Sequence, residues 1–251
     1  MNNKKRIADK SIYNDSKYYE EPKEYFKLIL SKINSIYNDS QKSKLTRIID
    51  VGGANGALLS FLKKHLPGLK MKCYEPLDSL IDIGKKLDSS IDFENYSLFD
   101  IPVLKEENKG DIIISAGVIG IFKNPEKFLF HLKKLGKKKS TILILSPFNE
   151  EPIDVILKYK HSKNNFWETG HNLFSIETMK NIALKFDLDF EIENFKMPFK
   201  IDKTDDPMRS WTEPFRGNDH QIIYGTNMFS TIKLLIFRNN HKKTNKNDFK
   251  K

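Results

Sequence analysis

The stretch Arg47-Ile-Ile-Asp-Val-Gly-Gly-Ala-Asn-Gly56 decides the fold, because an apolar segment runs directly into a glycine-rich turn. The residues after it, up to His65, have the pattern of a helix. Gly52 permits a tight turn that a side chain would block, and Gly56 lets the helix start close against the strand. The sequence therefore predicts a strand, a turn and a helix, with the backbone of the turn open to close approach by a ligand.

Short apolar runs alternate with helical patterns around this stretch. Strands are expected over 45–51, 69–75, 91–97, 111–118 and 140–148, with helices over 77–87 and 125–135 between them. A helix capped by Ser175, a strand over 187–195 and a last strand over 227–237 follow. An amphipathic helix from Glu20 to about Tyr37, with Pro22 in its first turn, precedes them. This alternation is typical of an α/β fold with a mostly parallel sheet and helices on both faces.

An acidic residue stands at the end of the second expected strand. Glu75, in Tyr74-Glu75-Pro76, can accept hydrogen bonds from both hydroxyls of a ribose. Parallel sheets bind ligands beyond the carboxyl ends of their strands, so Glu75 and the glycine turn belong to one edge. Together they predict a nucleoside-binding site.

The spacing of the glycines distinguishes between two nucleoside cofactors. A dinucleotide site needs G-x-G-x-x-G, whereas here the glycines stand at 52, 53 and 56, with Asp50 two residues before the first. The stretch resembles the D/E-x-G-x-G-x-G motif of class I S-adenosylmethionine-dependent methyltransferases. It departs from that motif where Ala54 replaces the middle glycine, and we expect a slightly displaced cofactor tail there.

The resemblance covers about residues 45–238 and implies S-adenosyl-L-methionine as cofactor, with S-adenosyl-L-homocysteine as product. It implies a three-layer Rossmann-like sandwich whose seven strands follow the order 3-2-1-4-5-7-6. In the favoured register Ser97 replaces an acid that commonly holds the adenine, and in a shifted register Asp100 takes that role. The cofactor residues that the resemblance implies are Asp50, Gly52, Gly53, Ala54, Asn55, Gly56, Glu75, Pro76, Ser97, Leu98, Phe99, Ser115, Ala116 and Gly117. Tyr18 and Tyr19 are expected either to close over the cofactor or to pack the first helix on the sheet.

The domain organisation follows from this resemblance. Residues 1–40 are expected to form an N-terminal arm with a lid or packing helix, and 41–238 the methyltransferase domain. Two insertions on the substrate side are expected over 149–172 and 196–225, and a basic disordered tail over 239–251.

The acceptor is expected to meet residues of the two insertions. His171 and His220 are candidates for a general base, although His171 could instead cap the following helix. The expected substrate-binding residues are Phe166, Trp167, Arg209, Trp211 and Arg216. Phe166 and Trp167 could equally be ordinary core residues beneath a loop. Arginine suits phosphate or carboxylate groups, so we expect a small anionic acceptor, although Glu213, Asp205 or Asp206 could pair with these arginines instead. Methylation of oxygen is favoured over nitrogen.

The distribution of charge along the chain narrows the classes of partner that are expected. The net charge is +10, but residues 1–10 carry +3 and residues 241–251 carry +4, so the body of the chain is nearly balanced. We therefore expect no nucleic-acid partner, and a methyltransferase of RNA or protein is the rival enzyme. The sequence also leaves open a cofactor-binding protein without catalysis and an NAD-dependent oxidoreductase.

The cysteine content and the hydropathy of the sequence indicate in which cellular environment the protein is expected. Cys73 is the single cysteine, which excludes an internal disulfide and a cysteine-rich zinc site, and no metal is expected. The longest apolar run, 112–122, is too short to span a membrane. A cytoplasmic protein is expected, and the sequence leaves the oligomeric state open.

Overall fold

The computed structural model describes residues 16–160, 165–203, 210–215, 217–223 and 231–238. The first fifteen residues of the predicted N-terminal segment 1–40 and the predicted tail over 239–251 lie outside these ranges.

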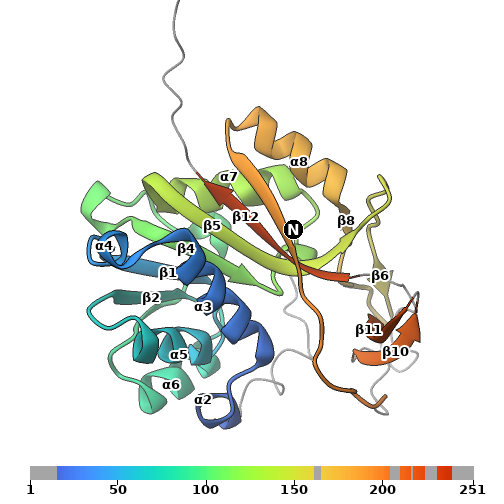
Figure 1. The fold of residues 1–251 in the computed structure, drawn as a ribbon, viewed down its shortest axis with the longest axis horizontal. Helices are drawn as coiled ribbons and strands as arrows, with labels where there is room; N and C mark the ends of the chain where they lie inside the picture. Colours follow the sequence, from blue (N-terminus) through green and yellow to red (C-terminus); the bar gives the residue numbers. More distant parts are fainter. Residues whose placement is uncertain (1–15, 161–164, 204–209, 216, 224–230, 239–251) are drawn as a thin grey trace, which may run out of the picture.

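One large sheet forms the middle layer, in the order β3-β2-β1-β4-β5-β12-β9 (Figure 1). Its strands are β1 (Arg47–Val51), β2 (Lys70–Tyr74), β3 (Asp92–Glu94), β4 (Gly110–Ala116), β5 (Gly136–Asn149), β9 (Asp189–Asn194) and β12 (Thr231–Arg238), and β8 (Phe174–Ser175) pairs with β5 beside this path. Neighbours among β1 to β5 run parallel, whereas β12 runs antiparallel to both β5 and β9. The predicted order 3-2-1-4-5-7-6 is therefore confirmed, since β9 and β12 are the sixth and seventh strands.

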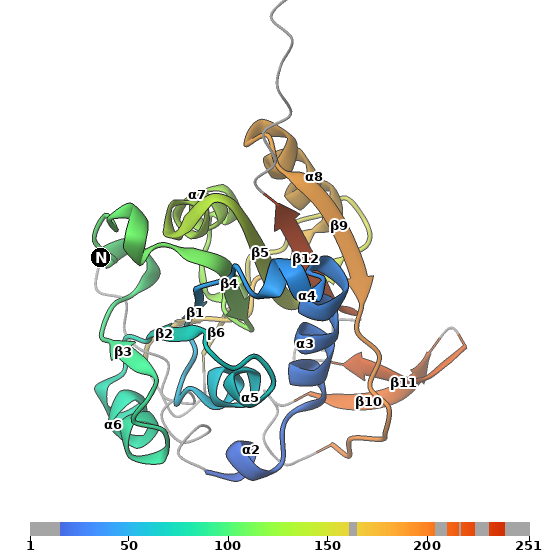
Figure 2. The same cartoon turned by 60° about the vertical axis from the view of Figure 1, so that its left-hand side comes forward.

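Helices cover both faces of the sheet, as Figure 2 shows. The long ones are α3 (Glu24–Ile36), α5 (Ala57–His65), α6 (Asp78–Leu87), α7 (Pro125–Leu135) and α8 (Ile176–Lys185). Shorter helical turns are α2 (Lys17–Glu20), α4 (Asp39–Lys42), η1 (Leu98–Asp100), η2 (Glu106–Asn108) and η3 (Ile119–Ile121). One apolar cluster joins α3, α5 and α6 to the sheet, and a second joins α7 and α8 to its other face. The expected three-layer sandwich is confirmed.

The first long helix starts later than the sequence predicts. The pattern predicted one helix from Glu20, but α2 ends at Glu20 and α3 starts at Glu24. The residue before a proline is disfavoured in the helical region, and Glu21, which precedes Pro22, has φ −111° and ψ 85°. The proline therefore separates two helices.

The two predicted insertions each contain a small hairpin outside the main sheet. β6 (Lys158–Tyr159) pairs with β7 (Glu168–Thr169), and β10 (Trp211–Phe215) pairs with β11 (Asn218–Ile223). Asp154 attaches the first insertion to α8, because its carboxylate accepts hydrogen bonds from the amide of Ser175 and the hydroxyl of Thr178. No helix in the described part of the chain is both long enough and apolar enough to cross a membrane.

Candidate active site

The glycine-rich turn after β1 holds three residues in the left-handed region of backbone conformation. φ is +74° at Gly52, +51° at Ala54 and +82° at Gly56. The amide of Gly52 donates a 2.7 Å hydrogen bond to the carbonyl of Tyr74 at the end of β2, which fixes the start of the turn. Gly52, Gly53 and Ala54 stay partly exposed, so a ligand can reach the turn from outside.

Side chains would not fit at either end of this turn. A Cβ added at Gly52 would lie 2.6 Å from Cγ2 of Val118, which belongs to the turn after β4. A Cβ added at Gly56 would lie 2.6 Å from Cζ of Phe93 on β3. The glycines therefore allow the turn to be enclosed by the neighbouring strand ends.

Ala54 is the exception to the glycine pattern. An alanine in the left-handed region costs about 1–2 kcal/mol. Its amide donates a 3.1 Å hydrogen bond to Oε2 of Glu75, which holds this conformation. The carbonyl of the next residue, Asn55, accepts a hydrogen bond from the hydroxyl of Tyr19.

Two carboxylates lie buried beside the turn. Asp50 is 2% exposed and Glu75 is 5% exposed, and Glu75 also accepts a 3.1 Å hydrogen bond from the amide of Leu77. Pro76, between Glu75 and Leu77, is partly buried. Burial, and then the negative charge of Glu75, raise the pKa of Asp50 to about 7. Two buried carboxylates beside one turn favour a cationic ligand.

The Asp50→Asn variant tests the raised pKa. The stability that the protonated carboxyl contributes is fully present below the unfolded pKa of 3.8 and is lost as pH rises through about 7. Asparagine resembles the protonated form, so the variant should gain stability relative to the native chain across this window, by at most about 1.4 kcal/mol per pH unit. Urea unfolding of both proteins, without ligand, at several values between pH 4 and pH 8 measures the difference. A constant difference across the range would contradict the assignment.

The end of β4 meets the end of β1. The hydroxyl of Ser115 donates a 3.1 Å hydrogen bond to the carbonyl of Val51, and Ala116 is partly exposed. Gly117, with φ +75°, is exposed, and a Cβ added there would meet no atom within 4 Å. β2 lies on one side of β1 in the sheet and β4 lies on the other, so the strand order reverses at β1. Open α/β sheets bind ligands at such a point, so we expect a ligand between the carboxyl ends of β1 and β4.

The segment after β3 lies between that strand and α7. Leu98 is buried, and Ser97 precedes it at the start of η1. The ring of Phe99 lies 4.9 Å from the ring of His131, measured between centroids, so it packs against α7. Asp100, the acid of the shifted register, is exposed.

The two N-terminal tyrosines lie on α2, next to the glycine turn. The hydroxyl of Tyr19 donates its hydrogen bond to Asn55 over 2.6 Å, and burial raises its pKa well above the usual value. Tyr18 lies 4.1 Å below the ammonium group of Lys23, measured to the ring centroid. Both tyrosines pack against the core on the α5 side, so they hold α2 on the turn.

The first insertion places His171 beside the turn after β4. A Cβ added at Gly120 would lie 3.4 Å from Nδ1 of His171, and the amide of Asn172 donates a 2.7 Å hydrogen bond to the carbonyl of Gly120. Phe166 is partly buried, whereas Trp167 is 68% exposed and lies at the surface.

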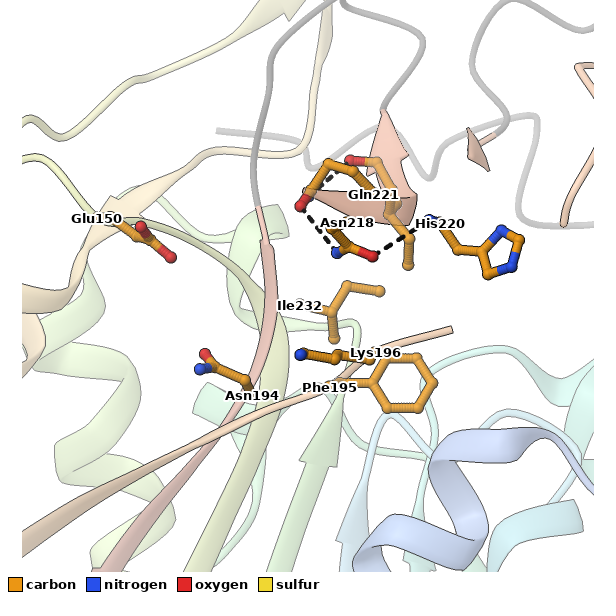
Figure 3. A pocket seen from close by; sticks show the side chains of 9 residues that line it. Glu150, Asn194, Phe195, Lys196, Asn218, His220, Gln221 and Ile232 are labelled. Carbon is orange, nitrogen blue, oxygen red and sulfur yellow. Dashed lines mark hydrogen bonds between the residues drawn. The ribbon is translucent and has the colours of Figure 1, made fainter. Parts of the chain in front are cut away.

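The second insertion borders a cavity of about 110 Å³ at the carboxyl ends of β5 and β9 (Figure 3). It is lined by Glu150, Asn194, Phe195, Lys196, Asn218, His220, Gln221, Ile222 and Ile232. Nδ1 of His220 is buried and has no hydrogen-bond partner among the described residues. Trp211, on the paired strand β10, is buried beneath the ammonium group of Lys203. Arg209 and Arg216 lie outside the described residues.

Lys233 was not predicted as a site residue. Its side chain is 6% exposed, and Nζ lies 2.9 Å from Oε1 of Glu150 and 2.7 Å from Oδ1 of Asn194. It therefore joins two residues of the cavity wall. A single lysine within the apolar run of β12 was the available signal.

Comparisons with known proteins agree with this arrangement. The family model described as a methyltransferase domain matches residues 19–191. Among curated proteins no sequence matches the chain. The plantazolicin methyltransferase BpumL, in complex with a triazolic desmethylPZN analog and SAH, has a TM-score of 0.59 at 15% identity, covering 94% of this chain and 92% of that one. A proposed sarcosine dimethylglycine methyltransferase from Galdieria sulphuraria has a TM-score of 0.55 at 17% identity, covering 84% and 83%.

Proposed function

This chain belongs to the methyltransferase domain family, and we propose that it transfers a methyl group to an oxygen atom of a small anionic molecule. It is an enzyme of the class I type that depends on S-adenosylmethionine. The pair of buried carboxylates beside the glycine turn supports the cofactor on which the proposal depends, because this cofactor has an ammonium group, a sulfonium group and two ribose hydroxyls for them to bind.

The residues at the carboxyl edge fit the cofactor. We assign the ribose hydroxyls to Glu75 and the ammonium group to Asp50, whose buried carboxyl would ionise beside a cation. The open space beside Gly117 suits the methionine part, and Leu98 supplies an apolar wall for the adenine. Bound there, the cofactor supplies a methyl group on a good leaving group, and the protein orients the acceptor in line with it.

The cavity of the second insertion supports a small anionic acceptor. Lys233 and Glu150 form an ion pair, and Lys196 is a further cationic residue among the described residues that line the cavity. The amides of Asn194 and Asn218 also line the cavity, and amides can donate to a carboxylate or phosphate. Arg209 and Arg216, in the same insertion, are proposed to add to this positive charge.

Calorimetry and a product screen test the proposal together. We expect S-adenosylmethionine to bind and NADH not to bind, and the protein to methylate a component of a metabolite extract, detected by mass spectrometry. Inorganic phosphate should inhibit that reaction by competing with an anionic acceptor. Methylation of RNA or protein instead would favour the rival enzyme class, whereas binding without transfer to any acceptor would indicate a non-catalytic protein.

A further inference from the structure

The backbone on both sides of His171 is held by hydrogen bonds. The amide of Gly170 donates a 2.9 Å bond to the carbonyl of Leu157, and the amide of Asn172 donates a 2.7 Å bond to the carbonyl of Gly120. The imidazole is therefore carried by a short segment that is attached at each neighbour. A side chain on such a segment keeps its place relative to the turn after β4.

The side chain of Asn172 adds two further attachments. Its amide nitrogen donates a 2.8 Å hydrogen bond to the carbonyl of Phe122, and its oxygen accepts a 3.0 Å bond from the amide of Leu157. Asn172 is 2% exposed, so water competes little for these bonds. One buried asparagine thus connects the insertion to the loop between β4 and α7.

Gly120 allows the imidazole to approach this loop closely. A Cβ there would lie 3.0 Å from the carbonyl oxygen of Asn172 and 3.4 Å from Nδ1 of His171. Gly117 and Val118 belong to the same loop, and Val118 covers Gly52 of the cofactor turn. His171, in the first insertion, therefore lies against the loop that forms one side of the crevice between β1 and β4.

We propose that His171 accepts the proton of the acceptor hydroxyl during methyl transfer. This role rests on the proposed function. The acceptor oxygen forms its bond to the methyl carbon, and the bond from that carbon to sulfur breaks with its electron pair staying on sulfur. The hydroxyl proton moves to a ring nitrogen of His171, which later releases it to water. A hydroxyl needs such a base because it is a weak nucleophile while protonated.

The segments whose backbone is hydrogen-bonded beside His171 carry few charged residues. The packed segments, residues 117–122 and Leu157, contain no titratable side chain, and neither do Gly170 and Asn172. Lys123 and Lys158 are the adjoining charged residues along these segments, and Lys158 is exposed. S-adenosylmethionine and S-adenosylhomocysteine differ by the sulfonium charge, so a proton acceptor beside the reacting methyl should distinguish them.

Nuclear magnetic resonance of the full chain tests this. The imidazole of His171 is assigned from the signal that His171→Gln removes, and its pKa is measured with saturating S-adenosylmethionine and with saturating S-adenosylhomocysteine. We expect the pKa to be lower by about one pH unit with the sulfonium ligand, because a nearby positive charge disfavours the protonated imidazole. His65, at the far end of α5, should titrate identically in both complexes.

The outcomes separate this inference from the function on which it rests. Equal pKa values for His171 in the two complexes, or an equal shift at His65, would overturn its role while calorimetry still shows both ligands bound. Failure of both ligands to bind in the calorimeter would instead overturn the proposed function. The measurement is made on the native chain, so it does not depend on the folding of a variant beyond the assignment.

Discussion

Replacing Glu75 with alanine is expected to weaken S-adenosylmethionine binding about a hundredfold. A hydrogen bond to a charged group contributes at least about 1.5 kcal/mol of binding free energy, and the variant loses two such bonds from the ribose hydroxyls. Each 1.4 kcal/mol corresponds to about a tenfold change in affinity, so the two bonds together account for about a hundredfold. The carboxylate also holds the amide of Ala54, so its loss frees the turn that the cofactor contacts. Isothermal titration of native and variant proteins at one pH measures the change.

Two further variants separate the carboxylate's role from general damage. Glu75→Gln keeps one acceptor oxygen and should lose about tenfold. Glu94→Gln changes a carboxylate at the end of the adjoining strand β3, where it pairs with Lys72, and should leave affinity within about twofold. Equal losses for the Glu75 and Glu94 variants would contradict the assignment of the ribose to Glu75.

Replacing Gly84 with alanine is expected to destabilise the protein by about 2 kcal/mol, although helix propensity alone would stabilise α6 by about 1 kcal/mol. A Cβ at this buried position would lie 2.6 Å from the carbonyl oxygen of Asn55 and would overlap the ring of Phe93. Asn55 belongs to the glycine turn, so cofactor affinity should fall as well. Urea unfolding and isothermal titration measure the two effects.

A control in the same helix and a double variant test this cause. Lys85→Ala, at the exposed next position of α6, should change stability by less than about 0.5 kcal/mol. In a Phe93→Leu background the cost of Gly84→Ala should shrink, because the shorter side chain vacates part of the space. Additive costs would show that the ring of Phe93 is not what the new methyl group meets.

The order of the main sheet could be predicted because its evidence is local. Most expected strands between residues 45 and 148 are apolar runs, and those over 45–51, 69–75 and 111–118 are each followed by a helical pattern, which leaves few ways to arrange a parallel sheet. The cap of α8 was readable in the same way, since the hydroxyl of Ser175 accepts a 3.0 Å hydrogen bond from the amide of Thr178. Pro22 was misread because its effect falls on the residue before it.

For the part of the site that would bind the methyl acceptor, the sequence predicted the segments involved but not the contacts of individual residues. His171 and His220 stood out by residue type, but their surroundings depend on contacts with residues far away in sequence, such as Gly120 and Ile232. Lys233 looked like one polar residue in a strand, because its partners Glu150 and Asn194 meet only when β12 lies between β5 and β9. Pairings of this kind are fixed by tertiary structure and leave little local signal.

The position of β12 has a consequence for biosynthesis. This strand is the last of the sheet in sequence, yet it lies between β5 and β9 and pairs with both along its length. While the chain emerges from the ribosome, β5 and β9 have no neighbour on the sides that β12 will occupy, and such open edges can pair with other chains. Completion of the sheet must wait until residue 238 has left the exit tunnel, so until then the parallel part from β1 to β5 has one side of β5 open.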